Sequence, residues 1–278
     1  MHPAPSSFKK KIIIAALVLL SFGIALLGAT GETGTSALGK SCNVSVVRIT
    51  GSMAVSRKDA TVTVPAEGES SQYSPVTYAD TVVEQIEAAE ADEEMKAILY
   101  IVNSDGGTTV SGEYIANAIT RSTKPNVAVI LERSLSASMM AIAPIQKIFA
   151  SPYSSVGSIG ITMSYFTEVE KNKKEGYSFV SLTSVPRKDI GNPALPASED
   201  DLKYIRSILE EDQKTLVTQV AAARKKPVEQ IQAVADGGYI SVRKALEVGL
   251  VDALGDMTDA KKYLAEKIGE EVVLCEEQ

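Results

Sequence analysis

The stretch Leu131–Thr162, LERSLSASMMAIAPIQKIFASPYSSVGSIGIT, carries the features that decide the fold and the chemistry. The apolar run Asn126–Leu131 that leads into it is typical of a buried strand. A turn of small residues follows at Ser134–Ser138, and then an apolar segment that suits a buried helix and ends at Pro144. A serine on a strand-to-helix turn either holds its hydroxyl out toward a substrate or caps the helix. The local pattern alone leaves both interpretations open.

A second signal lies upstream of the serine turn. The segment Lys96–Val102 predicts another buried strand, and the glycine-bearing segment Asn103–Gly107, NSDGG, follows it directly. Two adjacent glycines let the backbone turn tightly and leave N–H groups free to point at an anion. An ordinary strand-to-helix loop has the same pattern, so the motif is weak by itself.

Four motifs, in this order, resemble those of the signal peptide peptidase A family of membrane serine proteases. They are NSDGG at Asn103–Gly107, LSAS at Leu135–Ser138, VGSIG at Val156–Gly160 and RKDIG at Arg187–Gly191. The combination is specific, although no single motif is. The resemblance implies an α/β fold of the ClpP/crotonase type and a catalytic dyad of one serine and one lysine.

By this resemblance, Ser136 is the nucleophile and Lys188 is the general base. When the family's sequence after its serine is laid on Ser136 without a gap, Ile148 and Ala150 fall in matching places. A start at either neighbouring serine of the turn, Ser134 or Ser138, requires an insertion or a deletion. The resemblance therefore favours Ser136 among the three serines.

The resemblance also assigns the groups that surround the dyad. The oxyanion of an acyl-transfer intermediate needs two N–H donors, which are expected from Ala137 and from Gly106 or Gly107. Ser158 matches a family serine that hydrogen-bonds the lysine; alternatively, it is a strand-end serine satisfied by the backbone.

Two departures from the family pattern lie close to this site. Asp105 stands where the family has a proline, which brings a negative charge near the oxyanion hole, and Ala137 and Ser138 replace two glycines. Either departure can alter specificity or reduce activity, but neither removes a member of the dyad.

The residue types present restrict the chemistry independently of any resemblance. The only histidine is His2, on the far side of an apolar N-terminal segment, so the main domain lacks a Ser-His-Asp triad, a Cys-His pair and a His-ligated zinc site. A nucleophilic serine therefore needs a lysine or a carboxylate as its base. Because an amine accepts a proton only when it is neutral, a lysine base needs burial or a neighbouring cation, for which Arg187 is a candidate. No metal or cofactor is expected.

Composition also bears on the partners of the protein. The chain of 278 residues has a formal charge of −7 and no tryptophan, so a nucleic-acid partner is not expected. The basic triplet Arg224–Lys226 ends a predicted helix, where cations complement the helix dipole.

The N-terminal part predicts a membrane anchor. Residues 1–11 form a basic N-terminus that includes three consecutive lysines, and Ile12–Ala29 is an apolar run that as a helix would span about 27 Å, roughly one hydrocarbon core. The positive-inside bias places the N-terminus in the cytoplasm and the remainder outside, in a single-pass arrangement at the cell membrane. A cleaved signal peptide is the alternative. Residues 30–42 predict a flexible tether and residues 43–278 the peptidase domain.

The two cysteines, Cys42 and Cys275, bracket this domain. The predicted topology places them in a compartment that can be oxidising, where they either pair or remain free thiols.

Strands alternate with helices through the domain, which predicts βαβ units around a mostly parallel sheet. Further strands are expected at Ser158–Thr162, Tyr177–Leu182 and Glu271–Cys275. A long helix is expected from Glu199 to about Lys225, with an apolar face formed by Leu202, Ile205, Leu209, Leu216 and Val220.

These observations lead to one main hypothesis and two rivals. The main hypothesis is a membrane-anchored Ser–Lys endopeptidase that hydrolyses extended apolar peptides, such as remnant signal peptides. Because single-copy relatives form rings in which the lysine reaches a neighbour's serine, we expect a homo-oligomer with shared dyads. The rivals are a catalytically silent, membrane-tethered scaffold on the same fold and, more weakly, a crotonase-like acyl-thioester enzyme.

Overall fold

The computed structural model describes residues 42–57 and 75–275. They fall within the unit Cys42–Gln278, which is separate from the unit Met1–Ser41. The expected basic N-terminus, the membrane helix 12–29 and nearly all of the tether therefore lie outside the described residues. Within the described ranges, no helix is long and apolar enough to cross a membrane.

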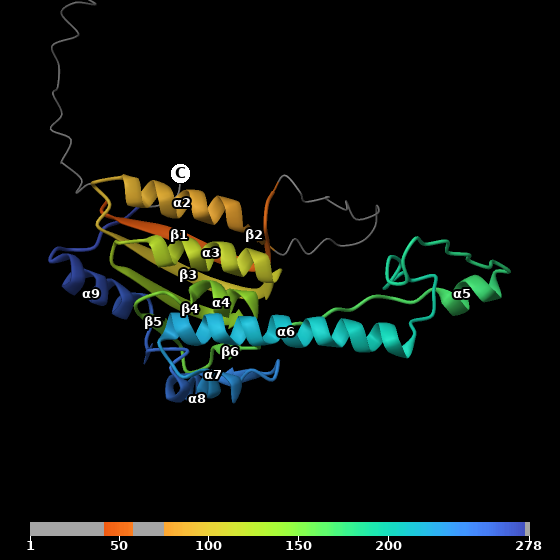
Figure 1. The fold of residues 1–278 in the computed structure, drawn as a ribbon. Helices are drawn as coiled ribbons and strands as arrows, with labels where there is room; N and C mark the ends of the chain where they lie inside the picture. The colour runs from red at the N-terminus through yellow and green to blue at the C-terminus, as the bar shows by residue number, and fades with distance from the viewer. Residues whose placement is uncertain (1–41, 58–74, 276–278) are drawn as a thin grey trace, which may run out of the picture. The chain divides into compact units, whose positions relative to one another are not determined.

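A mostly parallel sheet forms the centre of the domain (Figure 1). Its main path has the order β2-β1-β3-β4-β5-β8, with every neighbouring pair parallel. Beside this path, β6 is parallel to the end of β4, β7 is antiparallel to β6, and β9 is parallel to β1. The strands are β1 (Val44–Ala54), β2 (Val76–Tyr78), β3 (Ala97–Gly107), β4 (Asn126–Leu135), β5 (Ile148–Ala150), β6 (Ser155–Gly157), β7 (Tyr239–Ser241), β8 (Ala253–Leu254) and β9 (Leu274–Cys275).

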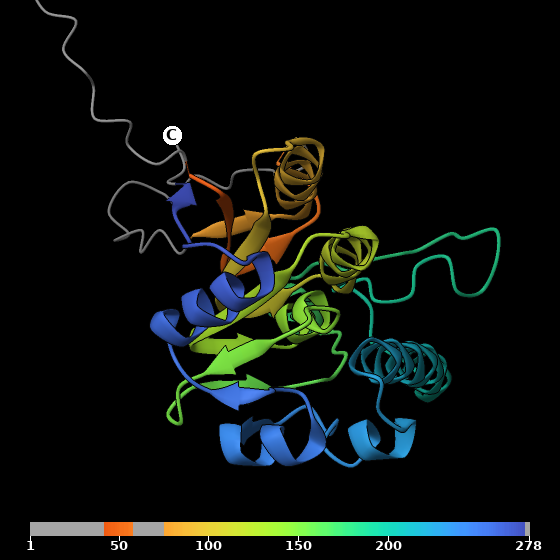
Figure 2. The ribbon, with the colours of Figure 1, turned by 90° about the vertical axis from the view of Figure 1, so that its left-hand side faces the viewer.

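Helices cover both faces of the sheet (Figure 2). α2, α3, α4 and the C-terminal half of α6 contribute to the larger apolar core on one face, and α9 to a smaller core on the other. The helices are α2 (Ala79–Ala91), α3 (Thr109–Arg121), α4 (Ala137–Ile142), α5 (Val169–Lys174), α6 (Glu199–Arg224), α7 (Val228–Gln232), α8 (Val242–Val248) and α9 (Met257–Ile268).

The first parts of β3 and β4, residues 97–102 and 127–130, are apolar without interruption because both faces of the sheet are covered there. Along β3, Ile98 and Tyr100 point into the larger core, whereas Leu99 and Ile101 point into the smaller one. The mixed α/β architecture with a mainly parallel sheet confirms the fold class expected from the sequence.

Three strand predictions are wrong or too long. The expected strand Ser158–Thr162 is absent, because β6 ends at Gly157 and the chain continues without strand pairing. Tyr177–Leu182 is not a strand either, and the closing strand Glu271–Cys275 shortens to two residues. Ser158–Thr162 leads into residues 162–198, which we call the arm, and Tyr177–Leu182 lies within the arm. Figure 1 shows the arm, with α5, extending past the N-terminal end of α6.

A disulfide bond between Cys42 and Cys275 closes the domain, with 5.0 Å between the two Cα atoms. The neighbouring Asn43 reinforces the closure, because its side chain donates to Glu271 O (3.0 Å) and accepts from the Val273 N–H (2.9 Å). The pairing that the sequence left open is therefore present in the structure.

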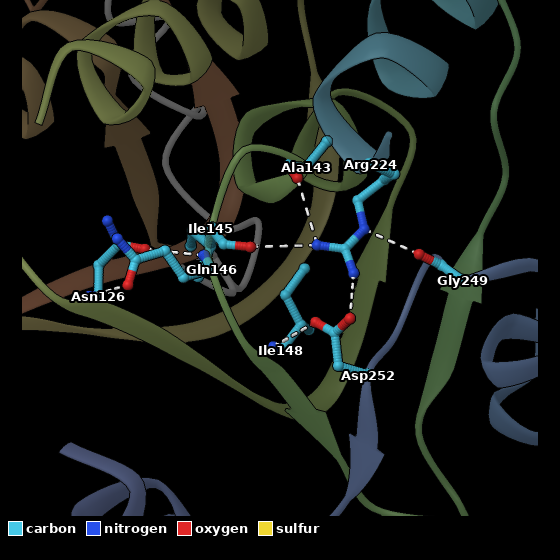
Figure 3. Close-up of polar contacts among 8 residues, drawn as sticks. All are labelled: Asn126, Ala143, Ile145, Gln146, Ile148, Arg224, Gly249 and Asp252. Carbon is cyan, nitrogen blue, oxygen red and sulfur yellow. Dashed lines mark hydrogen bonds and ion pairs between the residues drawn. The ribbon is translucent and has the colours of Figure 1, made fainter. Parts of the chain in front are cut away.

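Arg224 forms a buried polar junction beneath the sheet's edge (Figure 3). Its side chain is 6% exposed, and its guanidinium donates to Gly249 O (2.8 Å), Ile145 O (3.1 Å) and the Asp252 carboxylate. Asp252 in turn accepts the Ile148 N–H at 2.8 Å. Arg224 lies in the last turn of α6, as the sequence predicted, and its buried side chain ties the end of this helix to the segment before β5.

Replacing Arg224 by methionine should lower the free energy of unfolding by about 3 kcal/mol, because it leaves the Asp252 charge and two backbone carbonyls without their partner. Urea unfolding followed by circular dichroism measures the loss. The matched control is Arg121→Met, which breaks an ion pair with Glu87 whose side chains are 64% and 66% exposed. The control should cost less than about 1 kcal/mol. Equal losses in the two variants would contradict the role assigned to Arg224.

Candidate active site

Ser136 has an unusual backbone conformation at the junction of β4 and α4. Its φ of 52° and ψ of −126° lie in a region that residues other than glycine rarely adopt. Such a conformation costs on the order of 1–3 kcal/mol and persists only where the surroundings enforce it. Here the Ser136 N–H donates to Gly157 O of β6 at 2.8 Å, and the Ser136 carbonyl accepts the N–H groups of Met139 and Met140 in α4.

The three serines of the turn have different environments. Ser134 and Ser138 are fully buried, and their hydroxyl oxygens lie 2.9 Å apart in a mutual hydrogen bond. Ser136 is only partly buried and lines a cavity of about 630 Å³. Only Ser136 of the three is therefore placed to meet a substrate, as the motif alignment predicts.

Of the two backbone N–H groups at this turn that were expected to bind the oxyanion, that of Ala137 has no helix acceptor, whereas that of Gly106 is hydrogen-bonded. Ala137 is the first residue of α4, so its N–H has no acceptor within the helix. Gly106 packs against this turn with φ of 92°; a Cβ there would lie 2.9 Å from Ser136 Cβ and 3.0 Å from Ala137 N. The Gly106 N–H donates to Ser104 Oγ at 3.0 Å. Gly107 instead packs against Met53 of β1, so Gly106 is the glycine that the structure places beside the serine.

Asp105 does not leave an unpaired negative charge beside this turn. Its carboxylate accepts from Arg133 Nη1 at 3.0 Å, and Arg133 also contacts Glu132 at 2.8 Å. These hydrogen bonds, with Asp105 the largest contributor, raise the pKa of Arg133. The pair joins the ends of β3 and β4, the two strands that carry Gly106 and Ser136.

α6 and the segment after β6 form much of the cavity beside Ser136. The apolar part of the lining includes Ile161, Leu209 and Ala235, and the charged part Arg206, Glu210, Lys214 and Asp236. Gln213 connects α6 to the other segments around the cavity, because its Nε2 donates to Ala235 O after α7 (3.0 Å) and to Ile159 O after β6 (3.4 Å). The sequence analysis missed this contribution of α6, because helical periodicity assigned Leu209 to an ordinary core face.

Ser158 shares the cavity with Ser136. Its φ is 50°, its hydroxyl donates to Gly237 O at 2.9 Å, and its N–H donates to Gly238 O at 2.8 Å. The hydroxyl is thus satisfied by backbone in this chain, which was the alternative that the sequence left open.

Lys188 does not meet Ser136 of the same chain. It is exposed in a turn of the arm and is not among the residues that line the cavity. The preceding Arg187 is bound to Asp200 and Tyr204 at the start of α6, whereas Gln213, farther along the same helix, lines the cavity. At 1.5 Å per residue, the Arg187 contacts lie about 3–9 Å along α6 from Arg206, where the cavity lining of this helix begins, and about 14–20 Å from Gln213. Within one chain, Lys188 is therefore exposed outside the cavity that Ser136 lines.

Comparison with known proteins identifies the family. The model of Peptidase family S49 matches residues 118–271, more than half of the chain. The chain belongs to peptidase family S49. The matched range contains Ser136, Ser158 and Lys188. A Clp protease model matches residues 70–155, in agreement with the mixed α/β architecture around a mainly parallel sheet.

Curated relatives support the same family. A candidate protease of Methanocaldococcus jannaschii is 33% identical over 177 residues, which cover 63% of this chain and 57% of that protein. Protease 4 of Salmonella typhi is 32% identical over 67% of this chain and 31% of its own length. A candidate signal peptide peptidase, SppA, of Enterococcus faecium is 27% identical over 69% and 57%. The chain spans less than two thirds of each of these relatives. The signal peptide peptidase A family expected from the four motifs is confirmed.

Ser136→Ala should abolish covalent labelling by a fluorophosphonate probe, because Ser136 is the serine of the turn that faces the cavity. Ser138→Ala should still be labelled but should lose about 1–3 kcal/mol of stability, since it leaves the buried Ser134 hydroxyl unpaired. In-gel fluorescence and urea unfolding of the same preparations separate the two effects. Labelling that survives in Ser136→Ala and disappears in Ser138→Ala would identify Ser138 as the nucleophile and contradict the assignment to Ser136.

Proposed function

We propose that this chain is a serine endopeptidase in which Ser136 attacks the peptide carbonyl and Lys188 accepts the serine proton. The observation that carries the proposal is the strained Ser136 turn, which opens on a cavity in a chain of a peptidase family. Its substrates are extended apolar peptides, such as signal peptides that remain in the bilayer after processing. The name of the Enterococcus faecium relative supports this substrate class.

The reaction proceeds through two acyl transfers. The neutral Lys188 amine takes the hydroxyl proton as Ser136 Oγ bonds to the carbonyl carbon, and the oxyanion accepts hydrogen bonds from the Ala137 N–H and, once it leaves Ser104, the Gly106 N–H. The lysine then gives its proton to the leaving amine, and an ester to Ser136 remains. Water, deprotonated by the same amine, hydrolyses that ester and restores both groups.

The lysine of each site comes from a second copy of the chain. Lys188 is exposed and does not line the cavity beside its own Ser136, so in this proposal the lysine of another chain completes the dyad. The arm also carries an unusual set of exposed large apolar side chains, which a partner copy would bury. They are Met163, Tyr165, Phe166, Tyr177, Phe179, Val180, Leu182 and Val185.

The substrate preference rests on two features beside Ser136. Residues 159–167 form no strand, so within the described chain their backbone has no sheet partner where a peptide strand could add. Ile161, Leu209 and Ala235 provide an apolar part of the adjoining cavity for one substrate side chain. Together they favour an extended peptide with an apolar residue next to the cleaved bond.

The departures from the family pattern do not favour the silent-scaffold alternative. Arg133 pairs with the Asp105 charge, and Ser138 is bound to Ser134 beneath the turn. The positive-φ conformation of Ser136 is built despite the missing glycines. Because each departure is accommodated locally, the peptidase is the better-supported function, and an acyl-thioester enzyme has no feature of its own in its favour.

The proposed location is the outer side of the cell membrane, with Ile12–Ala29 as a single-pass anchor. The Cys42–Cys275 disulfide supports this placement because disulfides persist in oxidising compartments. Protease added to intact spheroplasts should digest the domain after Lys40 and leave the N-terminal residues protected. Immunoblotting with tags at each end gives the readout, and a cytoplasmic protein serves as the control for lysis. Protection of the whole domain would overturn this topology.

Mixing two inactive variants tests the shared dyad. Ser136→Ala and Lys188→Ala homo-oligomers should each lose at least about 10³-fold in peptidase kcat. Mixed oligomers, isolated through two different affinity tags, should regain about a quarter of the wild-type rate under random assembly, since one interface in four joins intact Ser136 to intact Lys188.

The control mixture pairs Ser136→Ala with a chain that carries both substitutions, and it should stay inactive at the same oligomer size. If the main mixture also stays inactive although mixed oligomers form, the dyad is not shared between chains. A monomeric active enzyme would lead to the same conclusion.

A further inference from the structure

The residues on either side of Lys188 are both bound to fixed parts of the arm and of α6. Arg187 contacts the first turn of α6, Asp189 contacts two other residues of the arm, and Lys188 lies between them in the turn. The Lys188 side chain itself is exposed and makes no hydrogen bond or ion pair with any residue that the structure describes. The turn thus fixes the lysine backbone while its amine remains available.

Arg187 makes two contacts with α6. Its Nη2 lies 2.8 Å from Asp200 Oδ2, and its guanidinium carbon lies 4.4 Å from the centre of the Tyr204 ring. The start of α6 is itself capped, because Ser198 and Asp201 exchange hydrogen bonds there. Arg187 therefore ties its turn to a rigid helix end. Its charge is directed at Asp200 and Tyr204, so it does not act as the free cation beside Lys188 that the sequence suggested.

Asp189 is bound on the other side of the lysine. Its carboxylate accepts hydrogen bonds from the Ser181 hydroxyl and from Asn192 Nδ2, the latter at 3.1 Å. These bonds, that from Ser181 first, lower the pKa of Asp189. Asn192 is held in turn, because its Oδ1 accepts the Ala194 N–H at 2.9 Å. These contacts turn the carboxylate toward the arm, and it makes no ion pair with Lys188, an interaction that would favour the protonated amine.

We propose that Arg187 and Asp189 are positioning residues that together hold Lys188 for delivery into the Ser136 cavity of a second copy of the chain. This inference rests on the proposed function, because it assumes that Lys188 is the general base. A base must meet the serine hydroxyl at hydrogen-bond distance, and a misplacement of about 1 Å can cost on the order of 10²-fold in rate. In the free chain the amine projects from an exposed arm, so the two flanking contacts supply the precision that burial would otherwise give.

The test measures kcat and KM of the assembled, full-length enzyme with a fluorogenic peptide. Arg187→Ala and Asp189→Ala should each lower kcat by about 10- to 100-fold. KM should stay within about two-fold, because neither residue lines the cavity. Asp189→Asn keeps an oxygen for Ser181 and should recover most of the lost rate. Lys173→Ala, an exposed change in the same arm, is the matched control and should leave kcat unchanged.

Rescue by a soluble amine distinguishes positioning from a general structural role. In a Lys188→Ala background, methylamine can replace the missing base, and its access to Ser136 does not depend on the turn. Adding Arg187→Ala or Asp189→Ala to that background should not change the rescued rate. An equal fall in the rescued rate would assign the two residues to folding or assembly and overturn the inference. If methylamine does not rescue Lys188→Ala, the kcat values decide between the two roles. A loss in Asp189→Ala that Asp189→Asn recovers supports positioning, and unchanged kcat in Arg187→Ala and Asp189→Ala overturns it.

The outcomes also separate this inference from the proposed function. If Lys188→Ala keeps wild-type activity, the Ser–Lys mechanism itself fails. If Lys188→Ala is inactive while Arg187→Ala and Asp189→Ala keep wild-type kcat, the mechanism stands and the positioning role is wrong. If Asp189→Ala fails to assemble, the kcat of Arg187→Ala decides alone. This variant should still fold, because the Arg187–Asp200 ion pair is exposed and contributes little to stability.

Discussion

The hydrogen bond from the Ser136 N–H to Gly157 O fixes the local geometry on which the site depends. It holds a non-glycine residue at positive φ, so β4 passes into α4 through a sharp turn instead of a gradual bend. The same bond brings the end of β6 beside the serine, and with it Ser158 and the unpaired segment that follows. Gly106 completes the turn from β3, where an added Cβ would come within 2.6 Å of Leu135 O. Strain in one residue is thus offset by contacts from two neighbouring strands and one helix.

α6 sets the second constraint, which is one of distance. Its C-terminal half is buried and is anchored through Arg224, its middle lines the cavity, and its N-terminal end carries the Arg187 contacts. A straight helix holds these three points at fixed separations. In the proposed mechanism the arm delivers its lysine to a neighbour's serine, which makes oligomer formation part of the proposed chemistry.

The sequence predicted those parts of the fold that depend on local patterns. The continuous apolar runs of β3 and β4 identified the central strands, and the glycines and serines after them identified the edge of the sheet that carries the site. Motif alignment selected Ser136, which the structure then distinguishes from Ser134 and Ser138 by burial. The buried Arg224 junction and the disulfide were not predictable in the same way, because each depends on residues that meet only through tertiary structure. Arg224 and Asp252, for example, carry no local sign that they pair.

The errors of the sequence analysis are informative about function. Ser158–Thr162 and Tyr177–Leu182 have the apolar, β-prone composition of strands, yet neither finds a sheet partner within the described chain. Of the two segments, only Tyr177–Leu182 remains exposed, whereas Ile159 of the first segment packs into the larger core. Exposed apolar side chains gathered in this way are typical of a surface that another molecule covers. In the proposed function, a peptide substrate adds as a strand beside the first segment, next to Ser136. A second copy of the chain is proposed to cover the second segment, which lies in the arm with Lys188. Both segments therefore lie where the proposed reaction needs an intermolecular contact.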